Sequence, residues 1–177
     1  VDVHVEDGCA RTTIDQTYFN AEMRCLEGTF YFPLPADASL SRLAMYVDGK
    51  RMEGGMVERD FGRQVYEKIV TSQRDPALLE WVDGSTFKMR VFPLEARQEK
   101  RVILSYTQRL PVLDGRSEYR FPAGNGLDVV GDWSFYAHIK GGKGIVCSSP
   151  SHQLNARQDG ADLLLGAAEK NVKSAAA

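Results

Sequence analysis

Three cysteines and three histidines are the side chains of this sequence best suited to covalent or metal chemistry. Cys147 with His138 or His152 could form a nucleophile and its general base, as a cysteine-dependent hydrolase requires. Cys147 follows Ile145 and Val146 in a segment that predicts a buried strand, however, and buried structural cysteines are inert. We therefore predict core packing for Cys147, with a hydrolase that uses Cys147 and His152 as the alternative.

The spacing of these residues does not match a metal motif. A structural zinc site needs four ligands, typically in two close pairs such as Cys-x-x-Cys. The candidate ligands form no such pair, and they are His4, Cys9, Cys25, His138, Cys147 and His152. The Gly-x-Ser-x-Gly nucleophile elbow and the glycine patterns of phosphate and dinucleotide loops are also missing from the sequence. The sequence therefore predicts no metal, no cofactor and no enzymatic activity.

The cysteines also make a poor disulfide framework, because their number is odd and their spacing is wide. Short secreted scaffolds that depend on disulfides carry more of them. The favoured interpretation is that Cys9, Cys25 and Cys147 are small buried hydrophobic side chains.

Length and composition are ordinary for a globular chain: 177 residues, 43% apolar and 26% charged. The formal net charge of −2 argues against a general nucleic-acid binder, which would carry a basic face. No apolar run reaches the roughly 18–20 residues that span a bilayer. Because the sequence begins at Val1 and ends in three alanines, we expect a fragment in which residues 174–177 are a cloning remnant.

Two apolar faces near the start of the chain predict one hairpin over residues 9–35. Side chains alternate over residues 10–20, and the return strand carries an aromatic run before two prolines that end it. A loop at residues 21–23 puts both apolar sets on one face and pairs Ile14 with Phe30. The same register keeps the first two cysteines far apart, so it predicts no disulfide between them.

Three further hairpins are each predicted around an Asp-Gly turn, and they cover residues 40–57, 77–92 and 154–165. Alternation predicts longer strands at residues 102–110 and 133–139, and turn signals that precede apolar residues predict shorter ones at residues 119–122 and 145–147.

One helix is predicted near residues 58–72, because Phe61, Val65 and Ile69 recur at every fourth position. Strands about 8–12 residues apart with turns between them indicate an antiparallel sandwich or barrel. We therefore predict a mainly β fold, an antiparallel β-sandwich with one α-helix over residues 1–111, followed by a smaller β unit over residues 112–173.

Several short segments occur in an order that matches a known family. They are Gly-Cys-Ala at 8–10, Gln-Thr-Tyr-Phe-Asn at 16–20, Glu-Gly-Thr-Phe-Tyr-Phe-Pro-Leu-Pro at 27–35, Asp-Gly at 48–49, Val-Glu-Arg at 57–59, Tyr-Glu at 66–67, Leu-Leu-Glu at 78–80, Val-Ile-Leu-Ser-Tyr at 102–106 and Leu110. Over roughly residues 3–111 the chain resembles the vault protein inter-alpha-trypsin (VIT) domain. It departs from the family pattern at Gly62, where alanine is usual, and at Cys9, which the family does not require.

Residues 119–122 and 149–152 resemble the segment that links a VIT domain to a von Willebrand factor A domain. The A domain's Asp-x-Ser-x-Ser metal loop is missing, because residues 83–86 lack the second serine. The resemblance implies a piece of a larger adhesion-type or matrix-associated protein whose activity is binding or scaffolding. It thereby implies a protein partner, or a neighbouring A-type domain of the same chain, and an extracytoplasmic location, with a cytoplasmic one as the alternative.

Two tyrosines are the candidate surface contacts of such an interaction module. Alternation places most aromatic side chains in the core, whereas Tyr31 and Tyr136 have the opposite parity. Packing under the predicted helix is the alternative for Tyr31. A purely structural spacer, which needs no apolar surface patch, is a further alternative.

Overall fold

The computed structural model describes residues 1–47, 49–54, 77–83, 86–122 and 129–173. This part of the chain contains strands and no helix, so the predicted mainly β fold is confirmed. The predicted helix near residues 58–72 lies outside the described residues. The strands are β1 (Asp2–Glu6), β2 (Cys9–Phe19), β3 (Leu26–Pro33), β4 (Ser39–Val47), β5 (Lys50–Glu53), β6 (Ala77–Asp83), β7 (Thr86–Leu94), β8 (Glu99–Arg109), β9 (Val129–Ile139), β10 (Asn155–Asp159) and β11 (Asp162–Lys173).

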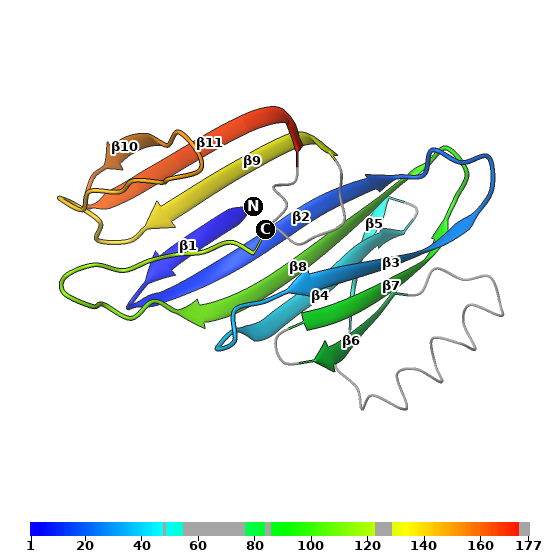
Figure 1. Ribbon diagram of the computed structural model, residues 1–177, viewed down its shortest axis with the longest axis horizontal. Coiled ribbons are helices and arrows are strands. Elements are labelled where there is room, and N and C mark those ends of the chain that lie inside the picture. Colours follow the sequence, from blue (N-terminus) through cyan, green and yellow to red (C-terminus); the bar gives the residue numbers. More distant parts are fainter. Residues whose placement is uncertain (48, 55–76, 84–85, 123–128, 174–177) are drawn as a thin grey trace. The chain divides into compact units, whose positions relative to one another are not determined.

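Hydrogen bonding joins the strands into two sheets (Figure 1). The larger sheet has the order β10-β11-β9-β1-β2-β8-β4-β5, and the smaller has the order β3-β7-β6. The chain divides into two compact units. Unit 1 comprises residues 1–14, 37–40 and 105–177, and unit 2 comprises residues 15–36 and 41–104.

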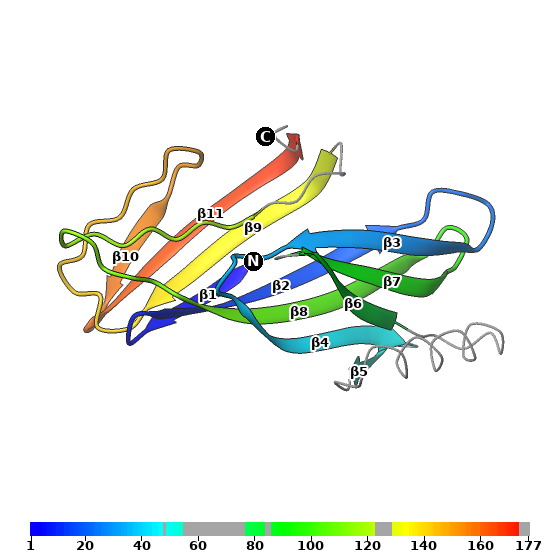
Figure 2. The same cartoon turned by 60° about the horizontal axis from the view of Figure 1, so that its bottom comes forward.

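Unit 1 is built on the strands β10-β11-β9-β1-β2, whose order can be followed in Figure 2. β1 pairs antiparallel with β2 and parallel with β9, although no sequence pattern predicted this strand. One face of these strands buries an apolar core made of Val3, Ala10, Leu110, Ala137, Leu163 and Leu165. The alternation predicted for residues 133–139 is confirmed, since Phe135 and Ile139 pack on this core beside Ala137.

In unit 2 the predicted hairpin over residues 9–35 is wrong. β3 pairs with β7, where Phe30 lies opposite Met89 and Phe32 opposite Phe87, whereas β2 belongs to the larger sheet. The two predicted apolar faces nevertheless meet, because Tyr18 stacks on Phe30 with their ring centroids 4.0 Å apart. The strands therefore contact each other across two sheets, as in a sandwich.

Asn20 explains why the connection between β2 and β3 is an arch. Its side-chain amide donates to the carbonyls of Arg24 (2.9 Å) and Leu94 (2.8 Å), and its oxygen accepts from the N–H of Glu22 (2.9 Å). Its own carbonyl accepts from the N–H of Arg97 at 3.1 Å. Because the side chain is only 5% exposed, these bonds hold the chain against the end of β7 and direct it into the other sheet.

The other predicted hairpins are confirmed. Val47 pairs with Lys50 across the turn between β4 and β5, and Asp159 pairs with Asp162 between β10 and β11. β6 and β7 form the third, with Phe87 and the two residues of the same parity that follow it buried as predicted. The predicted strand at residues 102–110 is β8. Val102, Leu104 and Tyr106 are buried as predicted, but Ile103 and Ser105 between them are buried as well.

Three further expectations are corrected. Residues 119–122 and 145–147 are not strands, and Val146 is 94% exposed. A short apolar run without alternation is too weak a pattern to predict a strand. Cys25 is exposed because it lies in the arch between β2 and β3, and Cys9 and Cys147 are only half-buried, although all three were predicted to be buried. No disulfide links the three cysteines. The division of the chain into domains 1–111 and 112–173 stays a prediction.

Candidate interaction face

The candidate site lies on the open face, which is the side of β10-β11-β9-β1-β2 opposite the unit 1 core. Successive side chains of a strand point to opposite faces, so the neighbours of core residues Val3 and Ala137 point away from the core. Tyr136 is 56% exposed on this face. His4 and His138 lie opposite each other on β1 and β9, next to it. The open face therefore carries aromatic and ionisable side chains on a framework of paired strands.

Tyr136 lies against the backbone of β11. Its partner on that strand is Gly166, and a Cβ atom at Gly166 would lie 3.7 Å from ring atoms Cδ1 and Cε1 of the tyrosine. On its other side, Tyr136 has Asp2 of β1 as its partner. The ring therefore lies over Gly166 at ordinary contact distance, between β11 and β1, and remains open to solvent.

The two histidines each contact a carboxylate. His138 Nε2 lies 2.7 Å from Asp162 Oδ2, and His4 Nε2 lies 3.3 Å from Asp2 Oδ1. The imidazole rings contact each other edge to face, with centroids 5.3 Å apart and planes inclined by 67°. Asp2, His4, His138 and Asp162 therefore form one continuous row of contacts, which we call the histidine pair and its two carboxylates.

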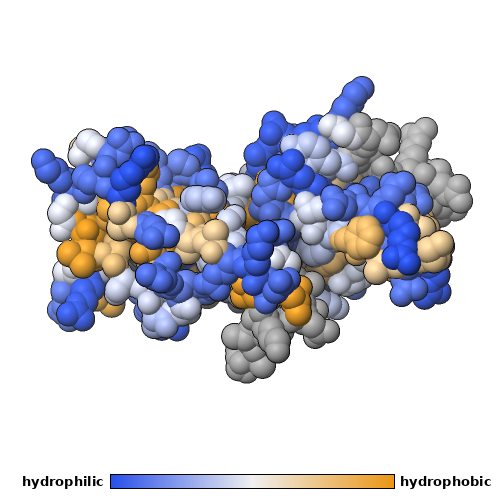
Figure 3. Space-filling model, turned by 90° about the horizontal axis from the view of Figure 1, so that it is seen from above, coloured by the Kyte–Doolittle hydropathy of each residue, from blue (hydrophilic) through white to orange (hydrophobic). Residues whose placement is uncertain are grey.

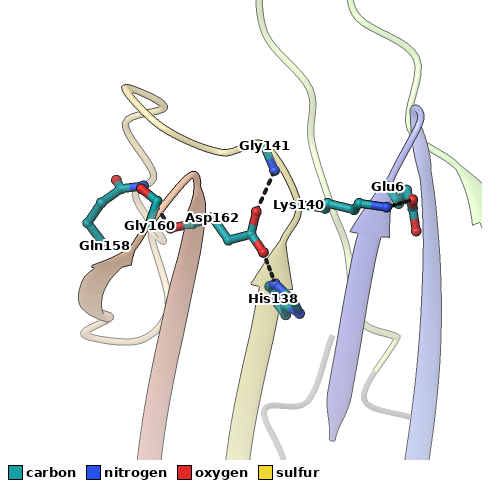
Figure 4. A network of polar contacts seen from close by, with 7 residues as sticks. All are labelled: Glu6, His138, Lys140, Gly141, Gln158, Gly160 and Asp162. Atoms are coloured by element: carbon teal, nitrogen blue, oxygen red, sulfur yellow. Dashed lines mark hydrogen bonds and ion pairs between the residues drawn. The ribbon is translucent and has the colours of Figure 1, made fainter.

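Asp162 anchors the turn between β9 and the β10-β11 hairpin, as Figure 4 shows. The N–H of Gly141 donates to Asp162 Oδ1 at 2.9 Å, and this bond together with His138 holds the pKa of the carboxyl below its usual range. Gln158 closes the hairpin by donating from Nε2 to the carbonyls of Asp162 (2.7 Å) and Gly160 (3.4 Å). Gly141 has φ +64°, a left-handed conformation that glycine adopts without strain.

An ion pair between Lys140 and Glu6 of β1 lies at the same end of the open face, as Figure 4 also shows. The ammonium group lowers the pKa of Glu6, and the carboxylate raises the pKa of Lys140. Both side chains are more than half exposed, so this pair adds little stability but fixes which charges border the histidines.

The structure does not assemble the nucleophile and base that the alternative hydrolase needs. Cys147 packs on the unit 1 core, and burial raises the pKa of its thiol. His152 stacks on Trp133 with ring centroids 4.4 Å apart, and its Nε2 lies 3.9 Å from Glu169. Within the described residues no hydrogen bond joins His152 or His138 to Cys147. A raised thiol pKa also lowers the fraction of reactive thiolate.

Tyr31, the second predicted surface contact, belongs to unit 2. It lies on β3 at an edge of the smaller sheet, opposite Lys88 of β7, and is 54% exposed. Side-chain parity thus placed both tyrosines at the surface correctly. Their role as contacts stays a prediction. The histidine pair escaped sequence analysis because its two members are 134 positions apart and only the parallel pairing of β1 with β9 brings them together.

Two broader features concern only the part of the chain that the structure describes. In it, no group of three or more His, Cys, Asp or Glu side chains is arranged to hold a metal ion. Nor does this part contain a helix long and apolar enough to cross a membrane. In the view of Figure 3, apolar surface is interspersed with polar and charged side chains.

Comparison with known proteins identifies the family. Residues 1–106, more than half of the chain, match the vault protein inter-alpha-trypsin domain, abbreviated VIT. The chain belongs to the VIT domain family. It is 29% identical over 126 residues to von Willebrand factor A domain-containing protein 5A from Homo sapiens, covering 70% of this chain and 16% of that protein. It is 25% identical over 126 residues to the protein mono-ADP-ribosyltransferase PARP4 from Homo sapiens, covering 69% of this chain and 7% of that protein.

The chain thus spans at most about a sixth of the length of these curated relatives. Within the chain, the VIT match ends at Tyr106, inside β8, so it includes β1 and β2 but not β9, β10 and β11. The open face therefore combines VIT strands with strands that follow the match. His4 lies within the matched part, whereas Tyr136, His138 and Asp162 lie beyond it.

Proposed function

We propose that this chain is a non-catalytic protein-interaction module of a larger VIT-domain protein, and that the open face of unit 1 is its contact surface. The observation that carries the proposal is Tyr136, whose exposed ring is held against Gly166 on paired strands. Tyrosine supplies a large contact area and loses little conformational freedom on binding, and it is enriched at the energetic centres of interfaces. The charged residues that surround it are typical of an interface rim.

The partner that we propose is a folded protein surface, either a separate protein or a von Willebrand A-type domain of the same chain. The human relative, a von Willebrand factor A domain-containing protein, supports the second form. We propose a scaffolding role at the cell surface or in the matrix. A purely structural spacer would not need an exposed aromatic ring in the middle of a sheet face, so the spacer and the interaction module predict different behaviour of Tyr136.

Photo-crosslinking in the full-length parent protein tests this function. p-Benzoylphenylalanine is placed at Tyr136, and at Val146 as a control that is 94% exposed in a loop of the same unit. We expect one dominant crosslinked peptide from position 136, and none from position 146. An excess of the free chain should compete with this crosslink, and the Tyr136→Ala chain should compete poorly. Equal crosslinking at both positions, or equal competition by both chains, would contradict the proposal.

The extracytoplasmic location is part of the same proposal, and a cytoplasmic one is its alternative. Cys25 separates the two because its thiol is exposed. An exposed thiol is oxidised or capped outside the cell and stays reduced in the cytosol. We expect Cys25 of the protein from its native source to resist maleimide until a reductant is added. Immediate labelling without reductant would favour the cytoplasm.

A further inference from the structure

The histidine pair has the spacing of two imidazoles bound to one metal ion. With metal–nitrogen distances of about 2.0–2.1 Å and tetrahedral angles, two imidazole ligands have ring centroids about 5 Å apart. The centroids of His4 and His138 are 5.3 Å apart, and the rings are inclined by 67° rather than stacked. Because the two residues are direct partners on β1 and β9, the backbone itself sets this spacing.

One ring nitrogen of each imidazole also contacts a carboxylate, as in many metal-bound histidines. A histidine that binds a metal through one ring nitrogen usually donates the N–H of the other to a carboxylate. His138 Nε2 lies 2.7 Å from Asp162 Oδ2, and an ionised carboxylate can only accept, so Nε2 carries the proton. His4 Nε2 lies 3.3 Å from Asp2 Oδ1, which is an ion-pair contact rather than a hydrogen bond. Neither Nδ1 has a hydrogen-bond partner among the described residues, so the Nδ1 lone pair of His138 remains to bind a cation, and either ring nitrogen of His4 can supply the second ligand.

The charges around the pair favour a cation. Asp2 and Asp162 contact the histidines directly. Of the nearest basic groups, Lys140 is neutralised by Glu6, and Arg11 of β2 is the cross-strand partner of His4. On the other side of His138 its partner is Leu164, which is uncharged. Both histidines are partly exposed, so a hydrated ion can reach them without any movement of the strands.

We propose that His4 and His138 form a binding site for one divalent transition-metal ion of the zinc, nickel or copper class. Imidazole nitrogen suits these metals, whereas magnesium and calcium prefer oxygen. Since no third side chain in the described part is placed to complete a metal site, water fills the remaining positions. Asp162 acts as a positioning residue that holds His138 in the binding tautomer, and Asp2 adds a negative charge beside His4. This site does not depend on the interaction proposed for Tyr136.

Titration of the full 177-residue chain with NiCl₂ or ZnCl₂ tests the proposal. Calorimetry at neutral pH should show one ion per chain, with His4→Gln and His138→Gln each lowering the association constant by at least about tenfold. His152→Gln is the matched control, since the chain has only three histidines and this one stacks on Trp133. Asp162→Asn should weaken binding by about tenfold. Binding should also weaken in acid, because protons compete for the imidazole nitrogen.

A second measurement separates the histidines from the thiols. In ¹⁵N spectra of the imidazoles, substoichiometric Cu²⁺ should broaden the signals of His4 and His138 and leave those of His152 unchanged. The Cys25→Ser chain should bind as tightly as the wild type. The proposal is overturned by undiminished binding in the His4→Gln and His138→Gln chains, or by the loss of binding in the Cys25→Ser chain alone. It is equally overturned if no ion binds at about 1 mM metal.

Discussion

Replacing Asn20 by alanine should unfold unit 2 at markedly lower urea concentration. The substitution removes three side-chain hydrogen bonds, to Glu22, Arg24 and Leu94, and leaves both backbone bonds of residue 20 in place. The arch between β2 and β3 depends on these bonds, because no glycine turn closes this connection. A loss of stability is therefore expected even though no apolar contact is deleted.

The loss of unfolding free energy depends on how exposed the groups are that lose their hydrogen bond to Asn20. Glu22 and Arg24 are exposed, so water can replace their bonds and each loss costs about 0.5–1 kcal/mol. The carbonyl of Leu94 is less accessible, and leaving it without a donor costs about 1–3 kcal/mol. Asn20→Ala should thus lower the free energy of unfolding by about 2–5 kcal/mol.

The assay is urea denaturation followed by circular dichroism. Met23→Ala is the control, because Met23 lies in the same loop, is 79% exposed and should cost less than about 0.5 kcal/mol. An Asn20→Ala change below about 1 kcal/mol, or equal to that of Met23→Ala, would refute the role of the arch.

Asn20→Asp gives a second test through pH. A carboxylate at this position would face the Arg24 and Leu94 carbonyls, so the folded state would raise its pKa above the unfolded value. The variant should be most stable below the unfolded pKa of about 4, and lose stability as pH rises through the folded pKa. A pH profile equal to that of the wild type would contradict this expectation.

Three other predictions test the packing, the charges and the thiols. Phe32→Ala should cost about 3–5 kcal/mol in urea denaturation, since the ring is buried between β3 and its neighbours; a change below about 1 kcal/mol would remove Phe32 from the core. Arg101 holds the pKa of Asp15 below its usual range, so their pairing stabilises the fold above the unfolded pKa and is lost as pH falls below about 4. Asp15→Asn should reduce the loss of unfolding free energy in acid by less than about 1 kcal/mol, because both side chains are partly exposed. An unchanged pH dependence of the unfolding free energy would contradict the pairing. Iodoacetamide should label Cys25 much faster than Cys147, whose thiol pKa is raised by burial; rapid labelling of Cys147 would revive the hydrolase alternative.

Alternation was enough to predict the strands that border a core, but it could not tell how they pair. Ile14 and Phe30 each belong to a strand with one apolar face. Two such strands have the same sequence pattern whether they are neighbours in one sheet or face each other across two sheets. The buried amide of Asn20 decides between these arrangements, and its burial cannot be read from the sequence. The strand predicted at residues 145–147 was wrong for a different reason. Its apolar residues do not alternate with polar ones, and only one of the three packs on the core.

The contacts of the candidate site were even harder to predict from the sequence than the pairing of these strands. Parity predicted that Tyr136 is exposed, because that property depends on one strand alone. The contact between His4 and His138 depends on β1 lying parallel to β9, a pairing between two strands 123 positions or more apart. A short strand of five residues carries too little pattern to predict its partner, so the histidine pair could be found only in the fold.

The pairing of β1 also bears on where the chain can be divided. β1 is bonded to β2 on one side and to β9 on the other, and Val3 is fully buried in a core that Ala137 and Leu163 complete. A chain that ends at residue 111 would keep β1 and β2 but lose β9 and β11, which exposes one edge of β1 and the apolar face around Val3. We therefore expect residues 1–111 alone to self-associate or to lose the protection of the Val3 amide in hydrogen exchange. A monomeric fragment in which that amide exchanges as slowly as in the full chain would show instead that the VIT strands fold without those that follow them.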